Sequence, residues 1–404
     1  MLKYCVYYET IEKMFRVCYN DLTIETLARI PKQMSSFYIS GKSYEANDED
    51  LQRYCVDIKL ASDELATSQS IKFNYIEPLE MKNGKTYFRT HQTNIETVFK
   101  MKSKGKYDSH EPIDMIEDAW FNRCNNGGLQ FCEPGIYETC CGYDFSNYYA
   151  SILGESDLQI PTKPGKQLHI NELPDKLLPG FYHVKITSDD VRILKVFTFS
   201  THNVYHYLSL KFALELKEKH CFDINFELQT DVKYNAYIYE FSDQVKTSTI
   251  FKNWYKHAIL ALKQEFPKNM LCKMLSSSLW GHMSRRNITC VDEERIDDYD
   301  VGLNPSCEYC IIDYVTKADN TSYYKLVKNA KPYNYNIRLK PFITAFGRNM
   351  TAKVALLDVD NVVRIHTDGI CFKTSQDFNI KNLKAEDKTT GHVEFRNVNN
   401  YRKI

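Results

Sequence analysis

The chain has 404 residues, 43% of them apolar and 26% charged, which is enough for two or three packed domains. No apolar run approaches the ~20 residues of a membrane span, so membrane and fibrous classes are excluded and no membrane partner is expected. The 52 basic and 52 acidic residues cancel, but a nucleic-acid partner is not thereby excluded, because the distribution of charge matters more than its sum.

The first segment, MLKYCVYYETIEKMF, carries charge every few residues and has no apolar core or cleavage site. No secretory signal is therefore expected, and the protein is predicted to be intracellular. Thirteen scattered cysteines fit thiols in a reducing compartment. Cys307 and Cys310 form the one Cys-x-x-Cys, and we interpret them as structural rather than as a metal knuckle because no second pair follows at zinc spacing.

Residues 1–115 mix short helical and extended patterns and end in the Lys-rich KMKSKGKYDSHEP, which indicates an exposed loop or a domain boundary. The paired glycines Gly127 and Gly128 follow in NNGG, and such a pair is typical of a sharp bend or of a close approach to a ligand. The next apolar run, TCCGY (139–143), predicts a strand.

Apolar residues at three- and four-residue spacing predict helices over 251–266 and 269–283, separated at Pro267, and another over 341–359. That helix leads into NVVRIHTDGICFKT (361–374), where a β-branched run, an Asp-Gly turn signal and a second apolar run predict a hairpin. Basic residues dominate 251–290 and 321–350, which makes both segments candidate polyanion-binding faces. The acidic VDEERIDDYD (291–300) between them is interpreted as a solvated loop.

Two aspartates stand at the ends of predicted strands. Asp144 ends the strand-like run after TCCGY, and Asp368 lies at the tip of the predicted hairpin. A strand end and a hairpin tip can meet, and paired carboxylates on neighbouring strands form an oxygen site for two Mg²⁺ ions that promote phosphoryl transfer. Taken singly, each aspartate is more typical of a turn or a cap. The pair predicts the geometry of a polymerase palm.

Three motifs around these positions resemble those of the family B DNA polymerases, especially the protein-primed branch of viruses and mobile elements. The resemblance covers about residues 115–404. DFSNYYASIL (144–153) is similar to motif A, with Asp144, Tyr149 and Ser151 at the matching places and Asn147 and Ala150 departing from it.

Motifs B and C follow in the family's order. KMLSSSLWG (273–281) is similar to motif B, with Lys273, Ser278 and Gly281 matching and with Ser277 and Trp280 in the Asn and Tyr places. IHTDGICF (365–372) is similar to motif C, with Thr367 and Asp368 matching. His366 stands where the family has its first aspartate and Gly369 where it has serine. Because the second aspartate is the one that bridges the metals in the family, the essential position is retained.

The resemblance also implies roles for individual residues. Asp144 and Asp368, with the backbone carbonyl of Phe145, would hold two Mg²⁺ ions, and His366 would favour Mn²⁺ as an alternative. Lys273 and Lys263 would contact the triphosphate, and Tyr149 would lie under the sugar. The residues expected to allow close approach to the nascent base pair are Ser277, Ser278 and Gly281. The residues expected at the DNA are Gly127, Gly128, Arg285, Arg286 and Tyr401.

The implied fold is α+β. It contains a polymerase palm with an antiparallel sheet and helical fingers, preceded by a partial exonuclease-like N-terminal region, and the thumb is expected to be missing. The expected divisions are an N-terminal region (1–115), a palm segment with motif A and an insertion (116–250), fingers helices with motif B (251–290), and a palm segment with an insertion and motif C (291–404).

The implied function is template-directed DNA polymerisation on a 3′-hydroxyl or on a hydroxyl of a priming protein, in viral or mobile-element replication. The expected partners are a DNA primer-template, deoxynucleoside triphosphates, a terminal priming protein and a separate thumb or exonuclease subunit, in host cytoplasm or nucleus. A catalytically inactive, nucleic-acid-binding fragment or subunit of a split polymerase is the first alternative. The second alternative is a compact interaction protein, in which these aspartates only cap turns and these lysines only occupy solvent-exposed helix faces.

Overall fold

The computed structural model describes the backbone of short strands within residues 4–88, and then residues 110–124, 126–260, 279–281, 283–302, 306–316 and 321–404. The chain divides into two compact units. The first comprises Met1–Ser109, Tyr149–Asp157 and Thr247–Met283. The second comprises His110–Tyr148, Leu158–Lys246 and Ser284–Ile404. The combination of helices with antiparallel sheets agrees with the expected α+β class.

Within the first unit, the N-terminal strands form one antiparallel sheet, β1 (Tyr4–Glu9), β2 (Met14–Tyr19) and β3 (Ile24–Leu27), and two hairpins, β4 (Ser36–Ile39) with β5 (Lys42–Glu45) and β6 (Pro78–Lys82) with β7 (Lys85–Phe88). The helical segments described in this unit include Tyr149–Glu155 of α4 (Tyr148–Glu155), whose first residue belongs to the second unit, and α6 (Thr247–Trp254), which continues as the π-helical turn η4 (Tyr255–Leu260). A side chain at Gly154 would lie 2.3 Å from Cβ of Tyr255, so glycine permits the close contact between α4 and η4. The first predicted helix thus begins four residues earlier than expected, at Thr247.

The second unit contains a five-stranded antiparallel sheet in the order β23-β10-β22-β21-β8. The strands are β8 (Gln130–Cys132), β10 (Cys141–Phe145), β21 (Val362–His366), β22 (Gly369–Phe372) and β23 (Leu383–Glu386). β22 is buried along its whole length, as is β21 up to its last residue, which accounts for their nearly continuous apolar sequence. The predicted hairpin is therefore present, with β21 and β22 as its strands.

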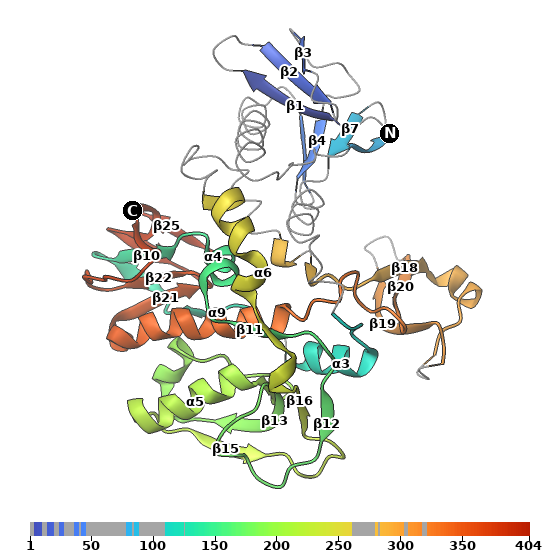
Figure 1. Ribbon diagram of the computed structural model, residues 1–404. Coiled ribbons are helices and arrows are strands. Elements are labelled where there is room, and N and C mark those ends of the chain that lie inside the picture. The colour runs from blue at the N-terminus through green and yellow to red at the C-terminus, as the bar shows by residue number, and fades with distance from the viewer. Residues whose placement is uncertain are drawn as a thin grey trace. The chain divides into compact units, whose positions relative to one another are not determined.

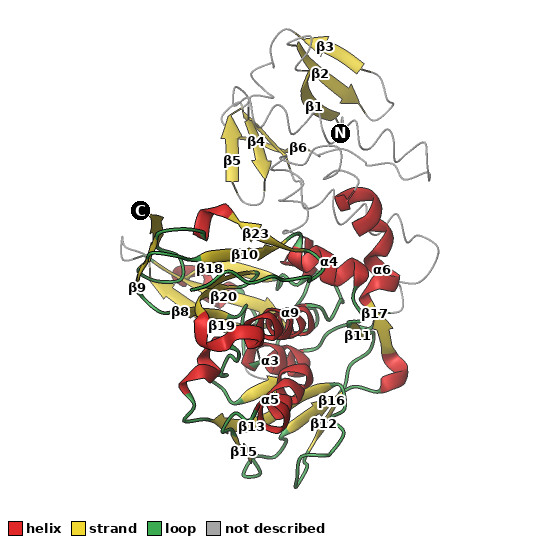
Figure 2. Ribbon diagram, turned by 90° about the vertical axis from the view of Figure 1, so that its left-hand side faces the viewer, coloured by secondary structure: helices red, strands yellow, loops and turns green. Residues whose placement is uncertain are grey.

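Helix α9 (Lys340–Ala355) lies along one face of this sheet and contacts β22 (Figure 1). Helix α5 (Tyr207–His220) packs on α9 and covers a second antiparallel sheet of the same unit, so both helices lie between the two sheets (Figure 2). The second sheet contains β12 (Lys166–Leu168), β16 (Ala236–Ile238), β13 (Gly180–Thr187) and β14 (Val204–His206), with β15 (Asn225–Leu228) also paired to β13. Rings of Phe181, Tyr239 and Phe342 pack edge to face or tilted in the core between these layers.

The second unit also contains smaller elements. They include helix α3 (Met115–Arg123), the pair β11 (Gln159–Pro161) and β17 (Gln244–Lys246), the sheet of β18 (Ile288–Asp292), β20 (Ser322–Lys328) and β19 (Tyr309–Thr316), and the sheet of β25 (Tyr401–Lys403), β24 (Val393–Phe395) and β9 (Gly135–Tyr137). The acidic stretch 291–300 is mostly exposed as expected, but it forms the end of β18 and a 3₁₀ helix, Glu293–Asp298, rather than a loop.

Cys307 and Cys310 are free thiols, as are the other cysteines whose side chains the structure describes. Among the described residues, no helix combines the length and apolarity needed to cross a bilayer.

Candidate active site

The two aspartates lie side by side at one end of the sheet. Strand β10 carries Asp144 opposite Gly369 of β22, and the amide of Phe145 donates a 3.0 Å hydrogen bond to the carbonyl of Asp368. Both aspartates are partly exposed. A Cβ at Gly369 would lie 3.5 Å from Oδ1 of Asp144, at van der Waals contact, which places this backbone position directly beside the carboxylate. Two segments far apart in the chain thus bring two carboxyl groups to neighbouring backbone positions.

The hairpin tip that carries Asp368 has an unfavourable backbone conformation. Its turn consists of Thr367 and Asp368, and Gly369 is already the first residue of β22, although the sequence suggested an Asp-Gly turn. Thr367 has φ of 61°, and the Asp368 amide bonds the His366 carbonyl at 2.8 Å. The left-handed region is unfavourable for a β-branched residue, so the surroundings must hold this turn in place.

The paired glycines supply part of that support. Gly127 has φ of +65°, which explains the bend, and its carbonyl accepts a 2.5 Å hydrogen bond from Nη1 of the buried Arg348 on α9. A Cβ at Gly128 would lie 2.6 Å from Oγ1 of Thr367, closer than any side chain permits. The amide of Thr367 also bonds the Leu129 carbonyl at 2.8 Å. The glycine pair therefore bends the chain and lets it approach the hairpin tip.

The contact at Gly128 predicts a stability effect. Gly128→Ala places a methyl group against Thr367, and we expect it to lower the free energy of unfolding by about 1–3 kcal/mol, as for other overpacked positions. Urea unfolding of the full chain measures the change. Gly281→Ala is the matched control, because a Cβ there meets nothing within 4 Å. Equal stability of Gly128→Ala and the unmodified protein would contradict the close approach.

The donor set at the aspartates fits a hard divalent cation. Among the described residues, no three His, Cys, Asp or Glu side chains gather to hold a metal by themselves. Two carboxylates and the Phe145 carbonyl suit Mg²⁺, which is commonly bound by one or two carboxylates and completes its shell with water and substrate phosphates. His366, partly exposed at the end of β21, pairs with Gln130 and with Gly369 across the strands and contributes no carboxylate.

One cation near the site was missed by sequence reasoning. Lys384 on β23 lies directly opposite Asp144, on the side away from Gly369, and is exposed. Opposed residues of antiparallel strands place their side chains on the same face, with Cβ atoms about 5 Å apart. The sequence around Lys384 has no strong strand pattern, so no signal could have placed it there.

The other predicted site residues are distributed elsewhere. In the first unit, the rings of Tyr149 and Trp280 lie 4.5 Å apart, and Gly281 is exposed. The remaining predicted substrate-binding residues, Lys263, Lys273, Ser277 and Ser278, lie outside the described residues.

Two predicted DNA contacts have partners within the protein. Nη2 of Arg286 lies 2.5 Å from Oδ2 of the buried Asp118 on α3, whereas Arg285 is exposed. The guanidinium of Arg364 lies 4.7 Å from the ring centroid of Tyr401. Contact of these residues with DNA stays a prediction.

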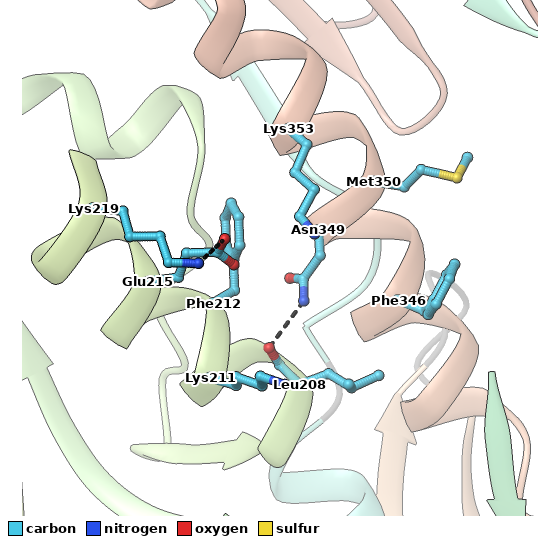
Figure 3. A pocket seen from close by; sticks show the side chains of 9 residues that line it. All are labelled: Leu208, Lys211, Phe212, Glu215, Lys219, Phe346, Asn349, Met350 and Lys353. Atoms are coloured by element: carbon cyan, nitrogen blue, oxygen red, sulfur yellow. Dashed lines mark hydrogen bonds and ion pairs between the residues drawn. The ribbon is translucent and has the colours of Figure 1, made fainter. Parts of the chain in front are cut away.

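A separate hollow of about 400 Å³ lies between α5 and α9 (Figure 3). Lys211, Lys219 and Lys353 line it against one acidic residue, Glu215, which pairs with Lys219 at 3.4 Å. It is therefore electropositive. Asn349 at its centre donates a 2.9 Å hydrogen bond to the Leu208 carbonyl (Figure 3).

Comparisons with known proteins give structural matches only. No family model matches the chain, and no curated protein matches it. Among solved structures, Phi29 DNA polymerase complexed with single-stranded DNA matches with a TM-score of 0.51 and 13% identity, over 98% of this chain and 72% of that chain. The same polymerase complexed with primer-template DNA and incoming nucleotides matches at 14% identity and a TM-score of 0.48, over 77% of this chain.

The chain spans 54% of the length of the polymerase in that ternary complex. At such low identity, the likeness shows that the fold resembles part of a DNA polymerase.

Proposed function

We propose that this protein is a template-directed DNA polymerase that adds deoxynucleotides to a 3′-hydroxyl, or to a hydroxyl of a priming protein. The observation that carries the proposal is the juxtaposition of Asp144 and Asp368, fixed by the Phe145–Asp368 backbone hydrogen bond of 3.0 Å. The likeness of the fold to part of Phi29 DNA polymerase supports the same reaction class. Fold alone does not specify function, so the paired carboxylates carry the argument.

In this proposal, Asp144, Asp368 and the Phe145 carbonyl would hold two Mg²⁺ ions, or Mn²⁺, which supply activation of the attacking hydroxyl and stabilisation of the leaving oxygen. The chain's own residues bind and orient the reactants. Lys263 and Lys273 neutralise the triphosphate, and the exposed Lys384 adds positive charge beside Asp144. Tyr149, packed on Trp280, lies under the sugar of the incoming nucleotide.

The remaining assignments concern the substrates and partners. Ser277, Ser278 and Gly281 allow close approach to the nascent base pair. Contacts to the primer-template come from Gly127, Gly128, Arg285, Arg286 and Tyr401. A priming protein, and a separate subunit that supplies a thumb or an exonuclease, complete the system, which replicates viral or mobile-element DNA inside a host cell.

One observation favours a second function. His366 stands in place of a carboxylate beside the proposed metal site and lowers its negative charge. In this alternative, the chain is an inactive nucleic-acid-binding fragment or subunit of a split polymerase. Such a protein would bind primer-template with a strong dependence on salt concentration and extend nothing.

Primer extension distinguishes the two functions. The full chain is incubated with a labelled primer-template, deoxynucleotides and either Mg²⁺ or Mn²⁺, and Asp144→Asn is the matched inactive variant. We expect metal-dependent extension that Asp144→Asn abolishes. Salt-sensitive DNA binding without extension in either metal would support the inactive alternative. Absence of both binding and extension would reject the polymerase proposal and favour an interaction protein.

A further inference from the structure

A buried chain of hydroxyl groups within the second unit leads from Tyr148 to the hairpin tip. The hydroxyl of Tyr148, the first residue of α4, lies 2.6 Å from Oγ1 of Thr351 on α9 and 2.5 Å from the Gly347 carbonyl. Oγ1 of Thr351 donates a 2.7 Å hydrogen bond to the carbonyl of Thr367. Tyr148 is 4% exposed and Thr351 is 0% exposed, so water does not compete for these bonds.

The bond that Thr351 donates to Thr367 fixes the direction of this chain, because it leaves Tyr148 as the donor in the Tyr148–Thr351 contact. Two hydroxyl protons serve three oxygen–oxygen contacts, because carbonyl oxygens only accept. The Thr351 proton goes to Thr367, and the Tyr148 proton is shared between Thr351 and Gly347. Accepting from Tyr148 orients the Thr351 hydroxyl and strengthens its bond to Thr367. Glycine at 347 permits the approach, since a Cβ there would lie 3.1 Å from the Tyr148 hydroxyl.

The acceptor of this chain is the strained residue beside the proposed catalytic carboxylate. Thr367, with φ of 61°, immediately precedes Asp368, and residues with such φ values persist only where several contacts fix them. The Leu129 carbonyl holds the Thr367 amide, the Phe145 amide holds the Asp368 carbonyl, and Thr351 holds the Thr367 carbonyl. Loss of the Thr351 bond leaves the peptide that joins Thr367 to Asp368 with the 2.8 Å bond from the Asp368 amide to the His366 carbonyl and without the bond to its own carbonyl.

We propose that Tyr148 and Thr351 are positioning residues that orient the Asp368 carboxylate through Thr367. This proposal rests on the proposed function, in which Asp368 is a metal ligand. A role in packing alone would need only the shapes of the two side chains, which phenylalanine and valine reproduce. The hydroxyl groups themselves carry the positioning effect, and their removal tests it.

Five variants test the hydroxyl groups. Tyr148→Phe and Thr351→Val remove them with little change of shape, and Thr351→Ser keeps the donor. Tyr182→Phe is the matched control, because this tyrosine is equally buried and its hydroxyl bonds the backbone of Leu178, away from the hairpin. The double variant Tyr148→Phe/Thr351→Val tests whether the two residues act in series.

Three measurements are made on the full chain. Amide hydrogen exchange of the peptide covering 365–370 is expected to accelerate in Tyr148→Phe and Thr351→Val only. Mn²⁺ affinity, followed by electron paramagnetic resonance of the free ion, is expected to fall by about 10-fold, as for other residues that orient metal ligands. In primer extension, kcat falls by about 10- to 100-fold with KM for the nucleotide nearly unchanged. Thr351→Ser restores all three, and the double variant is no worse than Thr351→Val.

The exchange and Mn²⁺ measurements keep this proposal separable from the proposed function. If exchange and Mn²⁺ affinity in Tyr148→Phe and Thr351→Val equal those of Tyr182→Phe, the positioning role is wrong even if the protein extends primers. If both change while the unmodified protein extends nothing, the positioning role stands and the polymerase proposal fails. A protein that binds no Mn²⁺ overturns both.

Discussion

Asp368→Asn is expected to reduce nucleotide incorporation by about 1,000-fold or more, whereas His366→Asp preserves it. An amide is neutral and a poor ligand for Mg²⁺, so the variant loses several kcal/mol of charge stabilisation in the transition state, and each ~1.4 kcal/mol corresponds to tenfold in rate. His366 lies two residues away on the same hairpin, at the end of β21, and is partly exposed. An added carboxylate there strengthens rather than opposes the binding of a cation.

Primer extension with saturating Mg²⁺ measures this contrast. Asp189→Asn, in an exposed loop after β13, is the matched control for the same chemical change away from the site and is expected to retain full activity. Equal loss of activity in Asp368→Asn and His366→Asp would show that the hairpin tip tolerates no substitution, and the metal assignment to Asp368 would then be wrong.

The strands and the hairpin of this site could be predicted because the sequence patterns that specify them lie within the elements themselves. The β-branched run before His366 and the short apolar run after Asp368 predict the hairpin that the structure contains, and TCCGY predicts β10. The turn lies one residue earlier in the chain than the sequence predicted. Gly369 lies in β22, and Thr367 takes the left-handed conformation that a glycine would normally supply.

The contacts that support the site could not be predicted, because each joins segments distant in the chain. Tyr148, Thr351 and Thr367 belong to α4, α9 and the hairpin, and nothing in their own neighbourhoods marks their hydroxyls as partners. The same holds for Lys384, whose place opposite Asp144 follows from the strand order β23-β10-β22.

The basic composition of 321–350 overstates its exposed positive charge for a related reason. Basic residues in 321–350 suggested a polyanion-binding face, but Arg338 and Arg348 within it are buried and bond to protein groups. A sequence gives the sign of a side chain's charge but not whether the side chain is exposed. Most residues of α9 are buried, and the basic residue Arg348 is one of them. The candidate face at 321–350 is therefore smaller than the sequence indicates.

Arg338→Met is expected to lower the free energy of unfolding by about 3–5 kcal/mol, because it leaves a buried carboxylate without its partner. Arg338 and Glu117 on α3 are both 0% exposed. They form two parallel bonds, Nε to Oε1 at 2.7 Å and Nη2 to Oε2 at 2.9 Å. The Tyr239 hydroxyl donates a further 2.6 Å bond to Oε1. Urea unfolding of the full chain measures the loss.

Two variants separate the unpaired charge from the lost packing. Glu117→Gln combined with Arg338→Met removes both charges, and we expect it to recover much of the stability that Arg338→Met loses. Lys185→Ala removes one partner of an exposed pair, Lys185–Glu227, and is expected to leave stability within experimental error. A double variant as unstable as Arg338→Met would mean that shape, and not the buried charge, is responsible.

The pH dependence of the Arg338→Met defect tests the same cause. Burial raises the pKa of Glu117 above its ordinary value of 4.5, and Arg338 is the strongest influence opposing that rise. Without Arg338, the folded state holds a proton that the unfolded state releases above about pH 4.5, so stability falls as the pH rises from there towards the folded pKa. The difference in unfolding free energy from the unmodified protein should therefore be larger at about pH 8 than at about pH 5. A defect of equal size at both pH values would mean that Glu117 does not carry the uncompensated charge.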